Sequence, residues 1–148
     1  MTKITNSIEI EASPEKVFAW ANDIKNMNEA MKGNAELEQT SNGPVGIGST
    51  FHFVGAAAGQ TAETDLQVTE YVKNKKFAFH SIGASKTKLA AQWTYEPTAK
   101  GTKLTIDTEY GVPYSILGKL IDKISIKKAM DKNNNTMLEN IKKANETK

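Results

Sequence analysis

The 148-residue chain contains no cysteine, only four prolines and no apolar run of membrane-spanning length. The lack of cysteine excludes a disulfide scaffold, a thiolate metal site and a cysteine nucleophile. Without a run of about 20 apolar residues, the sequence predicts no transmembrane helix. The first residues also lack the apolar core of a signal peptide. These absences predict a cytoplasmic protein, and the length favours a single domain over residues 1–148.

The excess of one charge sign is also small, because nineteen basic and seventeen acidic residues leave a net charge of +2. That balance does not indicate nucleic-acid binding, and the strands carry few of the lysines that base-stacking surfaces need. Positive charge gathers after Tyr114, where eight lysines face four acids. A solvated helix face accounts for this cluster without a partner. Contact of this basic segment with a membrane surface or an acidic partner stays open as an alternative.

The first thirty residues predict one strand followed by two short helices. Isoleucines alternate with polar residues over 4–11, which is typical of a half-buried strand. Ser13 and Pro14 are typical of the start of a helix, and Asp23 indicates a second helix start. Gly33 is expected to end that second helix.

The middle of the chain predicts a meander of about six strands between residues 34 and 111. Gly, Asn and Pro turns separate apolar or aromatic runs at 49–54, 61–72, 76–82, 87–96 and 102–110. Short connections between such runs favour antiparallel hairpins.

Beyond Pro113 the pattern predicts one helix of roughly thirty residues and about 45 Å. Its apolar face is not constant. Leu117, Leu120, Ile121 and Ile124 form one stripe, and Met137, Leu138, Ile141 and Ala144 form another, about a third of a turn away. The polar stretch 131–136 lies between them, so we expect a kink there or a helix that wraps a curved sheet.

This order of elements indicates an α+β fold in which one long helix covers a curved sheet of about seven strands. A single helix leaves space over such a sheet, so we expect an apolar cavity between them, of the ~300 Å³ class typical of ligand sites.

The element order and several local segments resemble the START-like (SRPBCC) superfamily with its helix-grip fold, and within it the polyketide cyclase/dehydrase and lipid-transport family. The resemblance spans nearly the whole chain. It rests on IEIEASPEKVF (8–18), NDI (22–24), GIGS (46–49), VTEY (68–71), WTYEP (93–97), GTKL (101–104) and LENIK (138–142). Met27, Met31 and Gly33 stand where members often carry tryptophan and proline, so details of the pocket mouth do not transfer.

Strand parity and the resemblance together predict the ligand-binding residues. Aromatic and aliphatic residues should line the cavity, with Tyr95, Tyr110 and Glu70 orienting the ligand through their polar atoms. The predicted set is Phe53, Leu66, Val68, Glu70, Phe79, Trp93, Tyr95, Ile106 and Tyr110 from the sheet, and Leu117, Leu120, Ile121 and Ile124 from the helix.

Glu70 allows two interpretations. It shares a strand face with Leu66 and Val68, so it is either desolvated or paired in the interior, or a bulge exposes it. His52 and His80 alternate with phenylalanines that should face the core, which favours an outward position for both imidazoles.

The resemblance implies binding or transport of a hydrophobic small molecule or lipid. A polyketide cyclase or dehydratase activity, using Glu70 or a histidine, and a protein-interaction role are the alternatives it allows. The sequence predicts no cofactor and no metal site, assigns no catalytic residue, and fits either a monomer or a weak homodimer.

Overall fold

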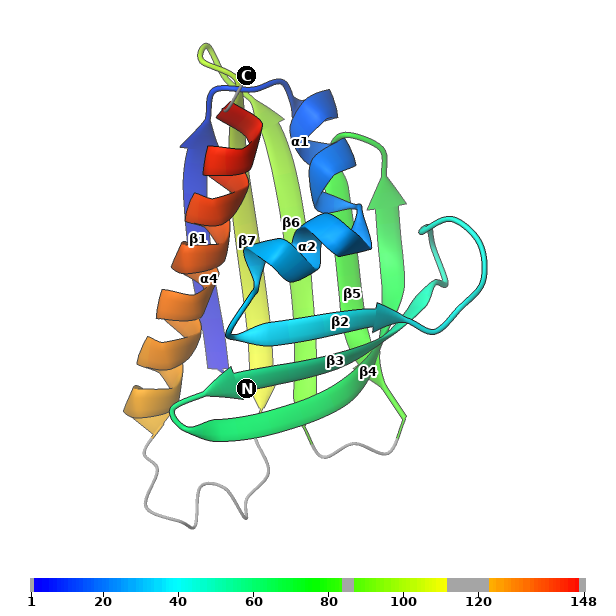
Figure 1. The fold of residues 1–148 in the computed structure, drawn as a ribbon, viewed down its shortest axis with the longest axis vertical. Coiled ribbons are helices and arrows are strands. Elements are labelled where there is room, and N and C mark those ends of the chain that lie inside the picture. Colours follow the sequence, from blue (N-terminus) through cyan, green and yellow to red (C-terminus); the bar gives the residue numbers. More distant parts are fainter. Residues whose placement is uncertain (1, 84–86, 112–122, 147–148) are drawn as a thin grey trace.

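The computed structural model describes residues 2–83, 87–111 and 123–146 (Figure 1). The elements in chain order are β1 (Thr2–Ile10), α1 (Pro14–Ala21), α2 (Ile24–Ala30), β2 (Ala35–Gln39), β3 (Thr50–Ala57), β4 (Gln60–Val72), β5 (Lys76–Ile82), β6 (Lys88–Pro97), β7 (Thr102–Gly111) and α4 (Lys123–Glu146). The predicted α+β helix-grip architecture is confirmed.

The sheet has seven strands in the order β1-β7-β6-β5-β4-β3-β2, and all neighbours are antiparallel. Strands β2 to β7 form the predicted meander, and β1 pairs with β7 along its whole length. In Figure 1, β1, β7, β6 and β5 run along the long axis while β2 and β3 cross it, so the sheet bends around a concave face. The helices lie on that face. Strand β3 runs to Ala57, further than the turn expected at Gly55.

Both short helices begin at the residues that the sequence indicated. The Ser13 hydroxyl accepts a hydrogen bond from the Lys16 N–H (3.2 Å), and Pro14 opens α1. The Asp23 carboxylate accepts one from the Lys25 N–H (3.0 Å) at the start of α2. Such caps satisfy N–H groups that have no partner within the helix. They fix the path by which α1 and α2 turn back over the sheet.

Helix α4 runs from Lys123 to Glu146 as one element, with no break at the polar stretch 131–136. The asparagines of that stretch hydrogen bond to the sheet. Asn133 donates to the backbone oxygen of Ala56 (2.9 Å), and Asn134 donates to Asn6 Oδ1 on β1 (3.2 Å). These contacts offset the low helix propensity of asparagine. The predicted helix before residue 123 lies outside the described residues.

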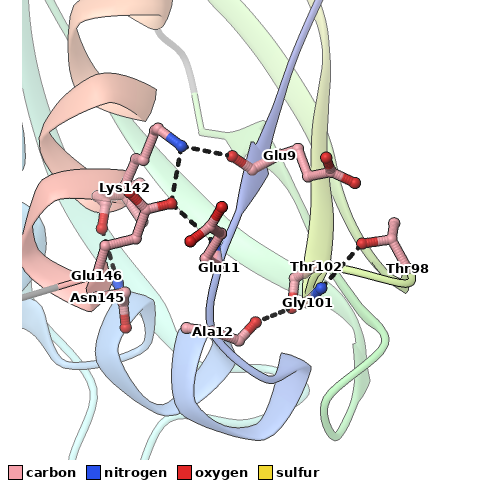
Figure 2. Close-up of polar contacts among 10 residues, drawn as sticks. Glu9, Glu11, Ala12, Thr98, Gly101, Thr102, Lys142, Asn145 and Glu146 are labelled. Carbon is pink, nitrogen blue, oxygen red and sulfur yellow. Dashed lines mark hydrogen bonds and ion pairs between the residues drawn. The ribbon is translucent and has the colours of Figure 1, made fainter.

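Polar contacts join the last turns of α4 to the end of β1 (Figure 2). Lys142 Nζ donates to the backbone oxygen of Glu9 (3.0 Å) and to Glu146 Oε2 (2.7 Å). The same Glu146 oxygen accepts the backbone N–H of Glu11 (2.8 Å). The Glu11 N–H holds the pKa of the Glu146 carboxyl below its usual range, and the Lys142 ammonium has a smaller effect in the same direction. The contacts fix this end of the helix on β1.

Candidate ligand-binding cavity

A cavity of about 220 Å³ lies between the concave face of the sheet and helices α2 and α4. Its lining comes mainly from α2, from strands β2 to β7 and from α4, and most of it is apolar. The side chains include Met27, Met31, Leu37, Phe51, Phe77, Leu89, Met130 and Met137. The volume is smaller than the ~300 Å³ expected from the fold. The cavity therefore suits a compact ligand.

Seven of the thirteen predicted ligand-binding residues line this cavity: Phe53, Leu66, Phe79, Trp93, Tyr95, Ile106 and Tyr110. All seven lie on strands in which alternating residues predict the inward-facing positions. Whether they touch a ligand remains a prediction. Val68, a further residue of the set, does not line the cavity. It is buried beside Phe51 and Leu66 in the core.

The helical part of the prediction is wrong for Ile124. This side chain is 65% exposed, because α4 faces the sheet with Ile126, Met137, Leu138 and Ile141. Ile124 precedes Ile126 by two residues, which places it about 200° away around the helix. Leu117, Leu120 and Ile121 lie outside the described residues.

Glu70 is exposed, so the second of its two interpretations, exposure by a bulge, is confirmed, and its place in the predicted cavity lining is wrong. The pairing of β4 with β5 shifts register between Val68 and Glu70, and this bulge reverses the inward and outward alternation of the strand. Glu70 turns outward and pairs with Lys76 (2.9 Å). Tyr71 turns inward instead and packs edge-on against Phe18, with ring centroids 5.3 Å apart.

We expect Glu70→Gln to leave both the stability and the ligand affinity of the protein nearly unchanged. An exposed ion pair contributes about 0.2–1 kcal/mol, and Glu70 does not line the cavity. Chemical denaturation and a binding titration measure the two quantities. A large loss of affinity in this variant, compared with Glu63→Gln on the same strand, would mean that Glu70 does orient a ligand.

Tyr95 and Tyr110 both line the cavity and keep their protons. Burial raises the pKa of Tyr95, and the nearby Tyr71 raises it further. Burial also raises the pKa of Tyr110, although a hydrogen bond between its side chain and Thr2 opposes this. The Tyr95 ring packs edge-on against Phe18, with centroids 5.0 Å apart. Both phenols are therefore neutral hydrogen-bonding groups at ordinary pH, not bases.

Neither imidazole lines the cavity. His80 is exposed, and His52 lies on the outer face of the sheet between two carboxylates of β4. His52 Nδ1 is 2.8 Å from Asp65 Oδ1, and His52 Nε2 is 3.1 Å from Glu63 Oε2. Both hydrogen bonds raise the pKa of His52 above its ordinary value, and the one to Asp65 has the larger effect. The outward position favoured by the sequence is confirmed for both histidines.

This arrangement predicts a pH-dependent contribution of His52 to stability. The folded state favours the imidazolium, so the contribution is fully present below the unfolded pKa of about 6.5 and is lost as pH rises through the raised folded pKa. The difference in unfolding free energy between the wild type and His52→Gln should shrink as the pH rises from about 6.5 through the raised folded-state pKa of His52. His80→Gln is the matched control, because no carboxylate flanks His80 among the described residues. A difference that is constant with pH would contradict the prediction.

The described part of the cavity has few charged or metal-ligating side chains. Lys88 is the one charged residue among the described lining residues. Within residues 2–83, 87–111 and 123–146, no group of three His, Cys, Asp or Glu side chains is placed to hold a metal ion. None of the helices in these ranges is long and apolar enough to cross a bilayer.

Sequence reasoning missed two features of the lining. The first is an amide face, formed by Asn133 and Asn134, since consecutive asparagines on a helix suggest a solvated surface. The second is a run of small residues at the end of β3, from Gly55 to Ala57, that lines the cavity. A Cβ at Gly55 would lie 2.8 Å from Cε1 of Phe53, so the absence of a side chain leaves room for that ring. Strand parity indicates which residues point inward but not how large the space above them is.

Comparison with known proteins places these features in a family. The sequence pattern of the family described as polyketide cyclase/dehydrase and lipid transport matches residues 1–146. No curated protein was found to match the chain.

Solved structures share the fold at low sequence identity. TTHA0849 from Thermus thermophilus is 21% identical with a TM-score of 0.80, over 96% of this chain and 95% of that one. StfQ, a di-domain ARO/CYC from the steffimycin biosynthetic pathway, is 16% identical with a TM-score of 0.75, over 97% of this chain and 50% of that one. Ara h 8.0201 is 10% identical with a TM-score of 0.67, over 97% and 96%. The START-like resemblance is thereby confirmed, and the chain belongs to the polyketide cyclase/dehydrase and lipid transport family.

Proposed function

We propose that the protein binds a compact hydrophobic molecule in the cavity between the sheet and α4, as a carrier or receptor. The observation that carries the proposal is the cavity of about 220 Å³ with its mainly apolar lining. Each Å² of apolar ligand surface removed from water there contributes about 25 cal/mol. Polar atoms from Tyr95, Thr108 and Asn134 can orient the ligand without charge.

A cyclase or dehydratase has less support, even though StfQ is an ARO/CYC protein. Such an enzyme needs an acid or base within hydrogen-bond reach of the bound substrate. Glu70, His52 and His80 do not line the cavity, its two tyrosines are not bases, and Lys88 is the one charged residue of the described lining. An interaction role has less support too. The exposed large apolar residues of the described chain are Ile47, Val72 and Ile124, in three separate segments, and scattered residues of this kind are normal.

The test is a fluorescence titration with 2-methoxynaphthalene, a small neutral fluorophore. We expect saturable binding of one probe per chain, with the bound probe shielded from iodide quenching. Glu70→Gln should bind equally well and serves as the surface control. Linear, unsaturable uptake of the probe, or full accessibility of the bound probe to iodide, would count against the proposal.

A further inference from the structure

One corner of the cavity is polar, where β7 meets the middle of α4. Thr108 from β7 and Asn134 from α4 both line the cavity there, and Thr108 is only 6% exposed. Asn134 Nδ2 donates to Asn6 Oδ1 (3.2 Å) and to Thr108 Oγ1 (3.4 Å).

The orientation of the Asn134 amide follows from a carboxylate at the far end of the same network. Asp131 can only accept hydrogen bonds, so the atom of Asn6 that lies 2.8 Å from Asp131 Oδ1 is the donor Nδ2. Asn6 Nδ2 also donates to Asn135 Oδ1 (3.1 Å). The other end of the Asn6 amide is therefore an acceptor, and it accepts from Asn134 Nδ2. Amide orientations are assigned from such networks, and this one starts from a group with a single possible role.

These bonds leave one hydrogen-bond acceptor and one hydrogen-bond donor unused at this corner. Asn134 Oδ1 is an acceptor with no hydrogen-bond partner among the described residues. The Thr108 hydroxyl accepts from Asn134, and its own proton has no acceptor in the same part of the chain. An acceptor and a donor thus belong to two contacting side chains that line a mainly apolar space.

A ligand hydroxyl is the smallest neutral group that matches both, because it donates and accepts at once. A carboxylate has no proton to donate to the Asn134 oxygen, which is itself an acceptor, and an ammonium group could not accept from Thr108. A purely hydrocarbon ligand would leave both protein groups unpaired, which costs binding free energy.

We propose that Thr108 and Asn134 form a hydroxyl-recognition site, so that the ligand is a neutral hydrophobic molecule with one hydroxyl group directed at this corner. The network from Asp131 through Asn6 positions the Asn134 amide. This inference rests on the proposed function, since it presumes that the cavity binds a ligand.

The test compares 2-naphthol with 2-methylnaphthalene, in which a methyl group replaces the hydroxyl at similar size. Equilibrium dialysis gives the ratio of their dissociation constants for the wild type, Thr108→Val and Thr108→Ser. Thr64→Val is the matched control, because Thr64 is also a buried threonine of the lining but lies on β4, outside the network. Comparing variants with the same two ligands removes differences in ligand hydration.

We expect Thr108→Val to lower the preference for 2-naphthol about five- to tenfold, the size of one neutral hydrogen bond. Thr108→Ser and Thr64→Val should retain the wild-type ratio. If both ligands bind but Thr108→Val keeps that ratio, the hydroxyl site is wrong while the proposed function stands. If neither ligand binds the wild type, the proposed function and the hydroxyl site both fail.

Discussion

Replacing Gly101 by alanine should lower the free energy of unfolding by about 3 kcal/mol, the largest loss of stability that we expect from a single added methyl group. Gly101 ends the turn between β6 and β7, next to the corner where β1 leads into α1 (Figure 2). A Cβ there would lie 2.4 Å from the backbone oxygen of Ile10 and 2.7 Å from the backbone N of Ala12. Both atoms are backbone, so no side-chain rotation relieves the overlap.

The neighbouring contacts make this corner hard to move. Thr102 Oγ1 donates to the backbone oxygen of Ala12 (2.7 Å), and the Gly101 N–H is bonded to Thr98 across the turn. Urea denaturation of Gly101→Ala measures the effect. Gly46→Ala is the control, because no atom lies within 4 Å of its added Cβ and its backbone is not left-handed. We expect a change within about 0.5 kcal/mol for the control. Equal, small effects in both variants would contradict the close approach at Gly101.

Replacing Ala91 by phenylalanine should weaken binding of 2-methoxynaphthalene at least tenfold, which corresponds to about 1.4 kcal/mol. Ala91 lies on β6, is 7% exposed and lines the cavity between Leu89 and Trp93. A phenyl ring at this position occupies the space that the probe needs. Because the ring also fills a void, the variant should remain folded, and filling a cavity often stabilises a protein by about 0.5–2 kcal/mol.

Ala90→Phe is the matched control for this variant. Ala90 is the preceding residue of the same strand, is half-buried, and does not line the cavity, since alternate side chains of a strand face opposite sides. Its affinity for the probe should stay within about twofold of the wild type, well under the ~1.4 kcal/mol of a tenfold change. The same titration, with thermal unfolding as a check on folding, compares the two variants. Equal affinities in Ala91→Phe and the wild type would show that the probe binds elsewhere.

Much of the fold could be predicted from the sequence because its signals are local. Ser13 and Asp23 cap their helices as their residue types indicate, and alternation places Phe53, Trp93 and Ile106 on the concave face. The strand order follows from short turns between successive strands. Pairing of the first strand with the last, by contrast, has no local signal, and the sequence did not predict it.

The errors at the site come from effects that a sequence pattern does not contain. The sequence allows a bulge at Glu70 but does not decide for it, because one extra residue in a strand leaves no periodic signature. The bulge after Val68 turns Glu70 outward and Tyr71 inward. Ile124 fails for another reason: the face that α4 presents to the sheet depends on where the helix is anchored. Lys142, Glu146 and the asparagines near residue 134 fix that face through tertiary contacts.

The most direct test of the cavity as a ligand site is an intermolecular NOE experiment on methyl-labelled protein with bound 2-methoxynaphthalene. We predict NOEs from the probe to methyl groups that line the cavity, in Leu66, Ile106 and Met137, and none to the exposed Ile47 and Ile124. NOEs to Ile47 or Ile124 with none to the three cavity residues would place the probe on the surface and contradict the proposed function.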